Sequence, residues 1–307
     1  MADLRAEPLS PIDTATLWPQ LGRLGTEIVA TRSSEHLLLT SALAATGLAR
    51  LPRVPRTTVI GIRRGLSYRG ILVARELAGG AGWDVESLRI ARDKDDEAVT
   101  ALLAAAGTEV ARREGRTLYM RLPQGSPHGA AVRRGGLMVY TEERLFAMLR
   151  TTADVDSGFR PAKSQDRHGI FRLYCRTVPE NVRRQEAPTQ QDWRAVYDWF
   201  DCDRQLVLDG EGSLAAWIGI GGREARLLAD TDVSTMVIEE ALDVVEAQEG
   251  RHNVLVAMQY QFELQRMAAE RGYTELGTRL LCARRLAVFN TLKEVVAVPA
   301  DTVPLPH

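Results

Sequence analysis

The sequence predicts an α+β fold that is built twice along one chain of 307 residues. Three observations carry this prediction: a repeated motif, helix-like stretches in matching places, and hairpin-like strand runs ahead of each helix. Early hairpins followed by alternating helices and strands are typical of α+β domains and differ from the pattern of a doubly wound sheet. We therefore expect two domains, each with a mixed, mostly antiparallel sheet flanked by helices.

The internal repeat is the most informative feature. The stretch 114–124 opens with Glu-Gly-Arg, continues through an apolar segment and ends in a glutamine, and the stretch 249–259 repeats this order with the same spacing. The two copies lie about one domain length apart. A duplication explains this arrangement better than chance does.

The flanks of the repeat agree in both halves. Apolar residues recur at helical spacing from Val99 to Val110 and again from Val233 to Val245. A strand-like run ending in an aspartate precedes each of these helices, and a shorter helix and a further strand follow each repeat. We expect Leu118, Leu255 and Val256 to be buried, together with Val99, Leu102 and Val237.

The expected division is an N-terminal domain over 1–150, a linker over 151–170, a C-terminal domain over 171–295 and a proline-containing tail over 296–307. Gly158 and Pro161 mark the linker as an exposed connector. The remaining expected elements are helices near 12–30, 33–46 and 189–200, and strands at 57–63, 68–77, 83–91, 171–178, 204–208, 213–219 and 223–228. Thr189 and Asp192 form a candidate capping pair for the last of these helices.

Composition excludes several classes of function. The net charge is −1, and the basic residues are interspersed with 40 carboxylates, so neither nucleic acid nor an anionic membrane is an expected partner. The three cysteines, Cys175, Cys202 and Cys282, lack metal-ligand spacing, and no metal is expected. Their odd number favours a reducing compartment and hence a cytoplasmic location. Oligomeric state stays open.

The element order of each half resembles that of the GNAT acetyltransferases. The helix end at 268–273, which closes in a glycine and a tyrosine, is similar to the family's ending before its last strands. The resemblance covers roughly 8–148 and 171–290. It implies a tandem GNAT-type protein, acetyl-CoA as the cofactor, and transfer of an acetyl group to an amine.

The family's phosphate-binding loop, Q/R-x-x-G-x-G/A, has no counterpart here. The matching positions are Arg92-Asp93-Lys94 in the first copy and Ala229-Asp230-Thr231 in the second, and neither segment contains a glycine. Aspartates are good helix N-caps and would occupy the N–H groups that a pyrophosphate needs. Each like-charge pair at about 4 Å would cost about 4 kcal/mol at an effective dielectric near 20. We therefore expect weak or absent acetyl-CoA binding.

Candidate catalytic residues are few. The family's general-acid tyrosine would fall on Val132 and Ala268 by count, which cannot donate a proton. Glu86 is the candidate base, because a half-buried carboxyl on a strand can have a raised pKa. Tyr260 is the candidate acid. His128 and the arginines around 112–116 are weaker alternatives, for a base and for an anion site.

Two readings of function follow. In the first, the chain is an acetyltransferase-like protein with degenerate cofactor motifs that acts by binding a small ligand or a protein partner. In the second, it is an active acetyl-CoA-dependent N-acyltransferase with an atypical phosphate-binding loop. A purely structural role for one half is compatible with the first reading.

Overall fold

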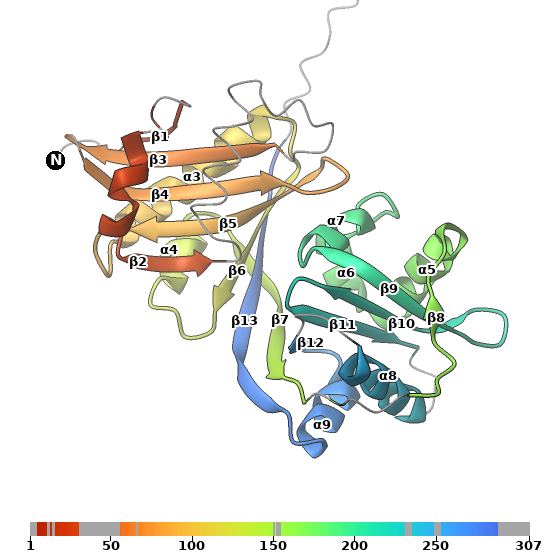
Figure 1. The fold of residues 1–307 in the computed structure, drawn as a ribbon. Helices are drawn as coiled ribbons and strands as arrows, with labels where there is room; N and C mark the ends of the chain where they lie inside the picture. The colour runs from red at the N-terminus through yellow and green to blue at the C-terminus, as the bar shows by residue number, and fades with distance from the viewer. Residues whose placement is uncertain are drawn as a thin grey trace, which may run out of the picture.

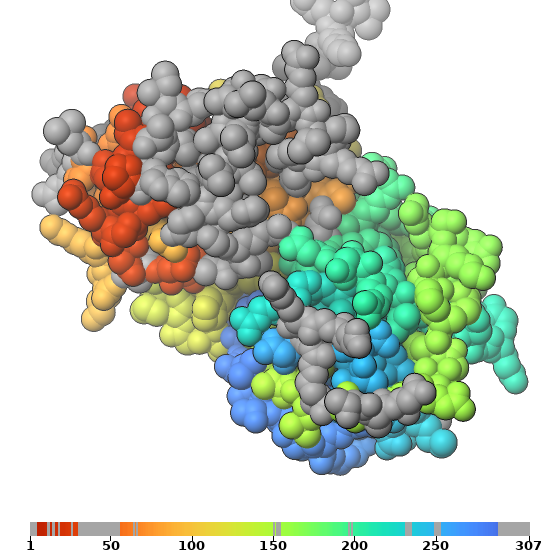
Figure 2. Space-filling view, viewed as in Figure 1, coloured from red at the N-terminus to blue at the C-terminus, as the bar shows by residue number. Residues whose placement is uncertain are grey.

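The structure is a computed structural model that describes residues 5–10, 13, 16–30, 56–65, 67–149, 151, 155–230, 235–248 and 253–287. Within these ranges the chain forms two lobes joined by a single 13-stranded sheet (Figures 1 and 2). The expected α+β class is confirmed. The helix expected over 33–46 lies outside the described residues.

The first half supplies the elements before residue 150. They are β1 (Ala6–Pro8), the 3₁₀ helix η1 (Trp18–Arg23), β2 (Thr26–Ala30), β3 (Thr57–Arg64), β4 (Ser67–Glu76), β5 (Gly82–Ile90), α3 (Asp96–Arg112), β6 (Thr117–Pro123), α4 (Gly129–Arg134) and β7 (Met138–Ala147). Helices α3 and α4 pack their apolar faces on one side of these strands (Figure 1).

The second half repeats this order. Its elements are β8 (Arg160–Pro161), the 3₁₀ helix η2 (Ser164–Asp166), α5 (Arg167–Thr177), α6 (Glu180–Glu186), α7 (Trp193–Asp198), β9 (Cys202–Asp209), β10 (Leu214–Gly221), β11 (Glu224–Ala229), α8 (Thr235–Ala247), β12 (Val254–Met258), α9 (Phe262–Glu270) and β13 (Thr274–Arg285). Helices α8 and α9 cover one face of its strands, and α5 to α7 cover the other.

The two halves exchange their last strands. The strand order is β1-β3-β4-β5-β6-β13-β7-β12-β11-β10-β9-β8, so β13 lies between β6 and β7 of the first half. In the same way β7 lies between β13 and β12 of the second half, and Figure 1 shows the two strands crossing between the lobes. The expected boundary at 151–170 stays a prediction, but the sheet itself is continuous across it.

Buried ion pairs accompany this exchange. Glu143 on β7 and Arg279 on β13 are register partners near the centre of the sheet, with Arg279 Nε 2.6 Å from Glu143 Oε1. Glu143 Oε2 also accepts from Arg226 of β11 at 3.0 Å. On β6, Arg121 donates to Asp84 at 3.1 Å, and burial raises the pKa of Asp84 to about 6 despite this partner. Because a buried charge that loses its partner is costly, these pairs favour the exchanged arrangement.

Several expected elements need correction. The stretch 171–178 belongs to helix α5 instead of a strand, because Ile170, Leu173 and Tyr174 form its buried helical face. The apolar residues Phe171, Leu173 and Cys175 alternate along the sequence, which is also the pattern of a strand, and this produced the wrong prediction. The stretch 12–30 contains η1 and strand β2 in place of one long helix.

The helix expected over 189–200 is shorter and begins at Trp193, but its capping pair forms one turn earlier. Thr189 Oγ1 donates to Asp192 Oδ2 at 2.6 Å, and the Asp192 N–H donates back to Thr189 Oγ1 at 3.2 Å. The linker also contains short elements, β8 and η2, in place of being wholly irregular.

Burial follows the expected core with one exception. Leu118, Val99, Leu102, Leu255 and Val256 are all at most 1% exposed. Val237 is half-buried instead of buried, because it lies in the first turn of α8. None of the helices in the described part of the chain is both long and apolar enough to cross a bilayer.

Candidate functional site

The wedge of the N-terminal half is the gap that opens where the parallel strands β5 and β6 stop pairing. Their ladder covers only Gly82–Val85 and Thr117–Met120. Beyond it, residues 87–90 of β5 pair instead with the antiparallel strand β2. The chain's own backbone therefore fills the N-terminal wedge.

The wedge of the C-terminal half lies at the equivalent place, between β11 and β12. Their ladder ends at Arg226 and Val256. The Asp230 N–H donates to Ala215 O on the β10 side, and strand polar groups alternate, so the N–H and C=O of Leu227 and Ala229 face the wedge. No described strand pairs with β11 there.

One side chain crosses the C-terminal wedge. Gln261, which precedes α9, donates from Nε2 to Leu227 O at 2.6 Å, and its Oε1 accepts from the Met258 N–H at 2.8 Å. The amide thus imitates one peptide unit of a missing strand. The side chain of Gln261 occupies the carbonyl oxygen of Leu227. The backbone polar groups of Ala229, further along β11, still face the wedge.

A cavity of about 300 Å³ lies at the mouth of the C-terminal wedge, which is the lower end of the usual range for ligand pockets. Its lining comes from the end of β11, the start of α8, the end of α5, and the turn before α9 together with the first residues of α9. The residues are Thr177, Leu227, Ala229, Asp230, Thr235, Ile238, Tyr260, Gln261, Phe262, Glu263 and Leu264. We call it the mouth cavity.

On the other face of β11 lies a narrow space of about 40 Å³, which we call the aromatic slot. Its walls include Tyr174, Trp193 and Trp217, with ring centroids 4.1 Å apart for Tyr174–Trp193 and 6.1 Å apart for Trp193–Trp217. Trp199 also lines it, and the buried Trp199 Nε1 has no hydrogen-bond acceptor among the described residues. Tyr260 and Gln261 line both this slot and the mouth cavity.

Glu186, the last residue of α6, is the buried carboxyl of the aromatic slot. Tyr140 donates to its Oε1 at 3.1 Å and Tyr174 to its Oε2 at 3.3 Å. Burial raises its pKa to about 7, although these hydroxyls and Arg226 favour the charged form. A carboxyl with this pKa can exchange a proton near neutral pH.

Tyr260 is the second titratable group of the slot. Burial, together with the nearby Glu186 carboxyl, raises the pKa of Tyr260 well above its usual value. Its hydroxyl therefore keeps its proton at neutral pH. The sequence prediction selected Tyr260 but missed Glu186, because the charged stretch 180–186 looks like a solvent-exposed helix when its neighbours are unknown.

The structure places Glu86 elsewhere. It is fully buried on β5 in the N-terminal half, where Arg75 Nε donates to its Oε1 at 2.5 Å. It lines neither the aromatic slot nor the mouth cavity. Glu86 and Tyr260, the two predicted catalytic residues, are therefore not brought to one site.

The predicted cofactor positions also separate. Arg92, Asp93 and Lys94 lie exposed in the turn before α3, and the following residue, Asp95, caps the helix by accepting from the Ala98 N–H at 3.2 Å. Arg69 donates twice to this carboxylate, at 2.5 and 2.7 Å, and holds the pKa of Asp95 below its usual value. The repulsion expected from an unpaired carboxylate is therefore reduced.

In the second copy, Ala229 and Asp230 line the mouth cavity, while Thr231 lies outside the described residues. Asp230 is 2.6 Å from the Arg176 guanidinium. This carboxylate too has a counter-charge that the sequence alone did not reveal.

The weaker candidates have structural roles. His128 Nδ1 lies 3.0 Å from Asp96 Oδ1 and ties the start of α4 to that of α3. Arg112 and Arg113 both pair with Glu109 on their own helix. Among the described residues, no three His, Cys, Asp or Glu side chains are grouped as metal ligands.

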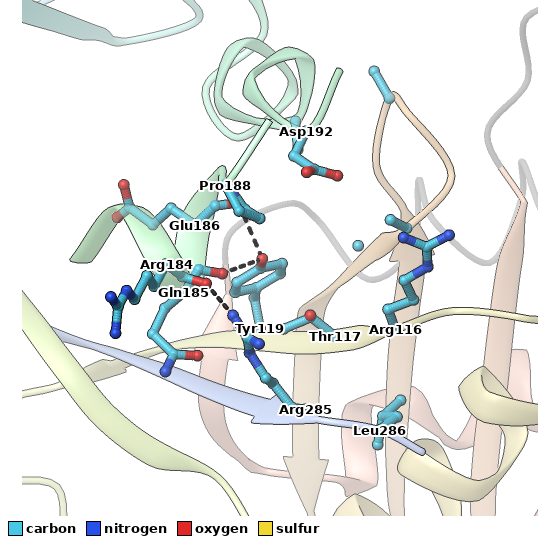
Figure 3. Close-up of a pocket in the computed structure, with 14 residues that line it drawn as sticks. Arg116, Thr117, Tyr119, Arg184, Gln185, Glu186, Pro188, Asp192, Arg285 and Leu286 are labelled. Carbon is cyan, nitrogen blue, oxygen red and sulfur yellow. Dashed lines mark hydrogen bonds between the residues drawn. The ribbon is translucent and has the colours of Figure 1, made fainter. Parts of the chain in front are cut away.

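A further cavity, of about 310 Å³, lies at the junction of the two lobes (Figure 3). Arg116, Arg184 and Arg285 line it, but Arg285 donates to the Arg184 carbonyl and Arg184 pairs with Glu180. Tyr119 forms its floor and donates to Gln185 O at 2.8 Å. These hydrogen bonds from Tyr119 and Arg285 hold the end of α6 in place, and with it Glu186.

Comparisons with known proteins agree with this topology. No protein-family profile and no curated protein matches the sequence. Solved structures do match: a tandem GNAT protein from the clavulanic acid biosynthesis pathway has 13% identity and a TM-score of 0.53, over 92% of this chain and 98% of that one. A GCN5-related N-acetyltransferase from Sphaerobacter thermophilus has 10% identity and a TM-score of 0.53, over 93% and 96%. A putative acetyltransferase from Pyrococcus horikoshii has 9% identity and a TM-score of 0.52, over 94% and 91%.

These likenesses extend over nearly the full length of each protein and establish the fold. The chain has a tandem GNAT fold, and the resemblance noted in the sequence is confirmed at this level.

Proposed function

We propose that this chain binds an acyl thioester of the coenzyme A type in the C-terminal wedge and that the N-terminal half serves as its scaffold. The open edge of β11 carries the proposal: Ala229 turns its backbone N–H and C=O toward the wedge without a described strand partner, and Leu227 O is bonded there by the side chain of Gln261 instead of a strand. The pantetheine arm of such a thioester is an extended chain with two amides. It can therefore pair with a strand edge as a peptide does.

The N-terminal half does not offer the same edge. Its wedge already holds β2, whose Val29 and Ala30 pair with Leu88 and Ser87 of β5. A ligand there would have to displace a backbone ladder. We therefore expect one ligand per chain.

The test is to fill the mouth cavity. Ile238 lines it and is half-buried, so Ile238→Trp should remove binding of acetyl-CoA and of acetyl-pantetheine in calorimetry. Met236→Trp is the matched control, because Met236 is 71% exposed on the same helix. In the wild type, ligand at 100 times Kd should stabilise the fold by about 2.7 kcal/mol. Equal binding by both variants would contradict the proposal.

Acyl transfer is the second candidate function, and Glu186 favours it. In this reaction an amine nitrogen attacks the thioester carbonyl carbon, the new C–N bond forms and the C–S bond breaks. Glu186 takes the proton that the amine loses, and Tyr260 gives its proton to the leaving thiolate. The Trp199 N–H, which has no acceptor among the described residues, offers a donor for an oxygen of the bound molecule.

A pair of variants tests the transfer. Glu186→Gln should lower kcat by about 10²- to 10⁴-fold, the usual contribution of a general base. Glu180→Gln, at the exposed start of the same helix, should leave kcat unchanged. If Glu186→Gln keeps full activity, Glu186 is not the general base; if no amine is acylated while the thioester binds, the chain is a binding protein. The three free thiols support a reducing, cytoplasmic location as part of this proposal.

A further inference from the structure

We propose that the C-terminal wedge recognises the pantetheine part of its ligand and gains little from the phosphates of coenzyme A. The inference rests on the proposed function and narrows its ligand to an extended, uncharged amide chain ending in a thiol or thioester. The charges at the mouth cavity point to it.

The described lining of the mouth cavity contains two acidic residues, Asp230 and Glu263, and no basic one. The nearest guanidinium, that of Arg176, is already engaged. It donates to Asp230 Oδ2 at 2.9 Å and to the carbonyl of Leu214 at 3.1 Å. A phosphate entering here would have to compete with Asp230 for this cation.

The sequence that follows β11 offers no substitute. Its sequence from 230 to 234 is Asp-Thr-Asp-Val-Ser, which contains neither a glycine nor a basic residue. A pyrophosphate needs closely approaching backbone N–H groups, which glycines permit, or guanidinium and ammonium groups. The chemistry of this segment therefore disfavours a phosphate.

The mouth cavity also has uncharged walls, which include apolar side chains. Phe262 is 72% exposed at its edge, and Leu227, Ile238 and Leu264 contribute further apolar surface. A solvent-exposed phenylalanine beside a cavity is the kind of surface that an uncharged chain covers. The Ala229 backbone offers a donor and an acceptor to its amides, and Leu227 O becomes an acceptor where the ligand displaces the Gln261 side chain.

The experiment compares coenzyme A with pantetheine by calorimetry on the full chain at 0.05 and 0.5 M salt. We expect the two Kd values to agree within about threefold and to change little with salt, because no phosphate contact is made. Coenzyme A binding more than tenfold tighter, with a strong salt dependence, would overturn the inference and leave the proposed function intact. Binding of neither compound would overturn both.

A charge variant tests the role of Asp230. Asp230→Asn should release Arg176 and tighten coenzyme A by about three- to tenfold at low salt, with pantetheine unchanged. Glu275→Gln, exposed on β13, is the control and should change neither. If Asp230→Asn tightens both ligands equally, or neither, Asp230 does not set the preference against phosphate.

Discussion

The wedges of the two halves differ in what fills them. Beside β5 of the N-terminal half, the wedge holds strand β2, which continues the sheet. Beside β11 of the C-terminal half, no described strand enters the wedge, and the side chain of Gln261 spans one peptide's width of it. The same element order can thus give a filled or an open site, and the difference comes from a segment outside the repeat.

The N-terminal half, whose wedge is filled, is still needed to build the C-terminal site. Strand β12, which forms one wall of the open wedge, is backed by β7 of the N-terminal half. The exchanged strands therefore make the N-terminal half part of the C-terminal site. Each prediction below tests this division between a scaffold half and a ligand half.

The largest expected effect comes from the wall of the open wedge. Val256 on β12 is 1% exposed, so Val256→Asp should lower the free energy of unfolding by more than about 4 kcal/mol. Urea unfolding measures this. Val254→Asp, two residues earlier and half-exposed, should cost much less. Equal stability of wild type and Val256→Asp would show that β12 is not this wall.

Two of the buried glutamates, Glu86 and Glu186, sharpen the comparison next. Glu86 in the scaffold half pairs with buried Arg75, so Glu86→Gln should cost about 3 kcal/mol because the guanidinium loses its counter-charge. Ligand affinity and any transferase activity should stay at wild-type values. A stable Glu86→Gln variant without activity would return Glu86 to the list of catalytic candidates.

Glu186 in the ligand half should behave in the opposite way. Its pKa is raised to about 7 in the folded chain, mainly by burial, so the folded state holds a proton that the unfolded state releases near pH 4.5. Stability should therefore fall as the pH rises from about 4.5 to about 7, by up to about 3 kcal/mol, and stay level above it. The groups that face this carboxyl are Tyr140, Tyr174, Tyr260, Arg226 and Glu143.

Unfolding curves at several pH values check this prediction. Glu186→Gln should remove the decline and be more stable than wild type at pH 8. A wild type whose stability does not fall between pH 5 and pH 7.5 would mean that Glu186 titrates like an exposed glutamate.

The smallest expected effect concerns the cap of the helix that carries Trp193 into the aromatic slot. Thr189→Ala removes the hydroxyl that Asp192 bonds and should cost about 1 kcal/mol. The control is Thr108→Ala, at an exposed position of α3 whose hydroxyl donates to Ala104 O of the same helix. A loss of several kcal/mol for Thr189→Ala would show that α7 depends on more than its cap.

The sequence predicted most elements of the central repeat, because their apolar periodicity is strong. It could not predict the exchanged strands: the patterns of β7 and β13 fix their burial but not which neighbours they pair with. The sequence predicted a strand where the structure has α5, because Leu173 fits both a helical and an alternating apolar pattern.

For the site, the sequence identified Ala229 and Asp230 from family positions and Tyr260 as a tyrosine near the expected general-acid position, and all three line the mouth cavity. Glu186 escaped detection because its burial depends on β7 and α5 folding over it. The counter-charges of Asp95 and Asp230 were hidden for the same reason, since Arg69 and Arg176 are distant in sequence.

Hydrogen exchange at the two wedges tests the central claim most directly. Without ligand, amides of 87–90 should exchange slowly, because β2 pairs with them, whereas the Ala229 amide should exchange faster. Saturating acetyl-pantetheine should slow exchange in 227–229 and leave 87–90 unchanged. Protection that appears at 87–90, or bound ligand that leaves 227–229 unprotected, would contradict the account of one filled and one open wedge.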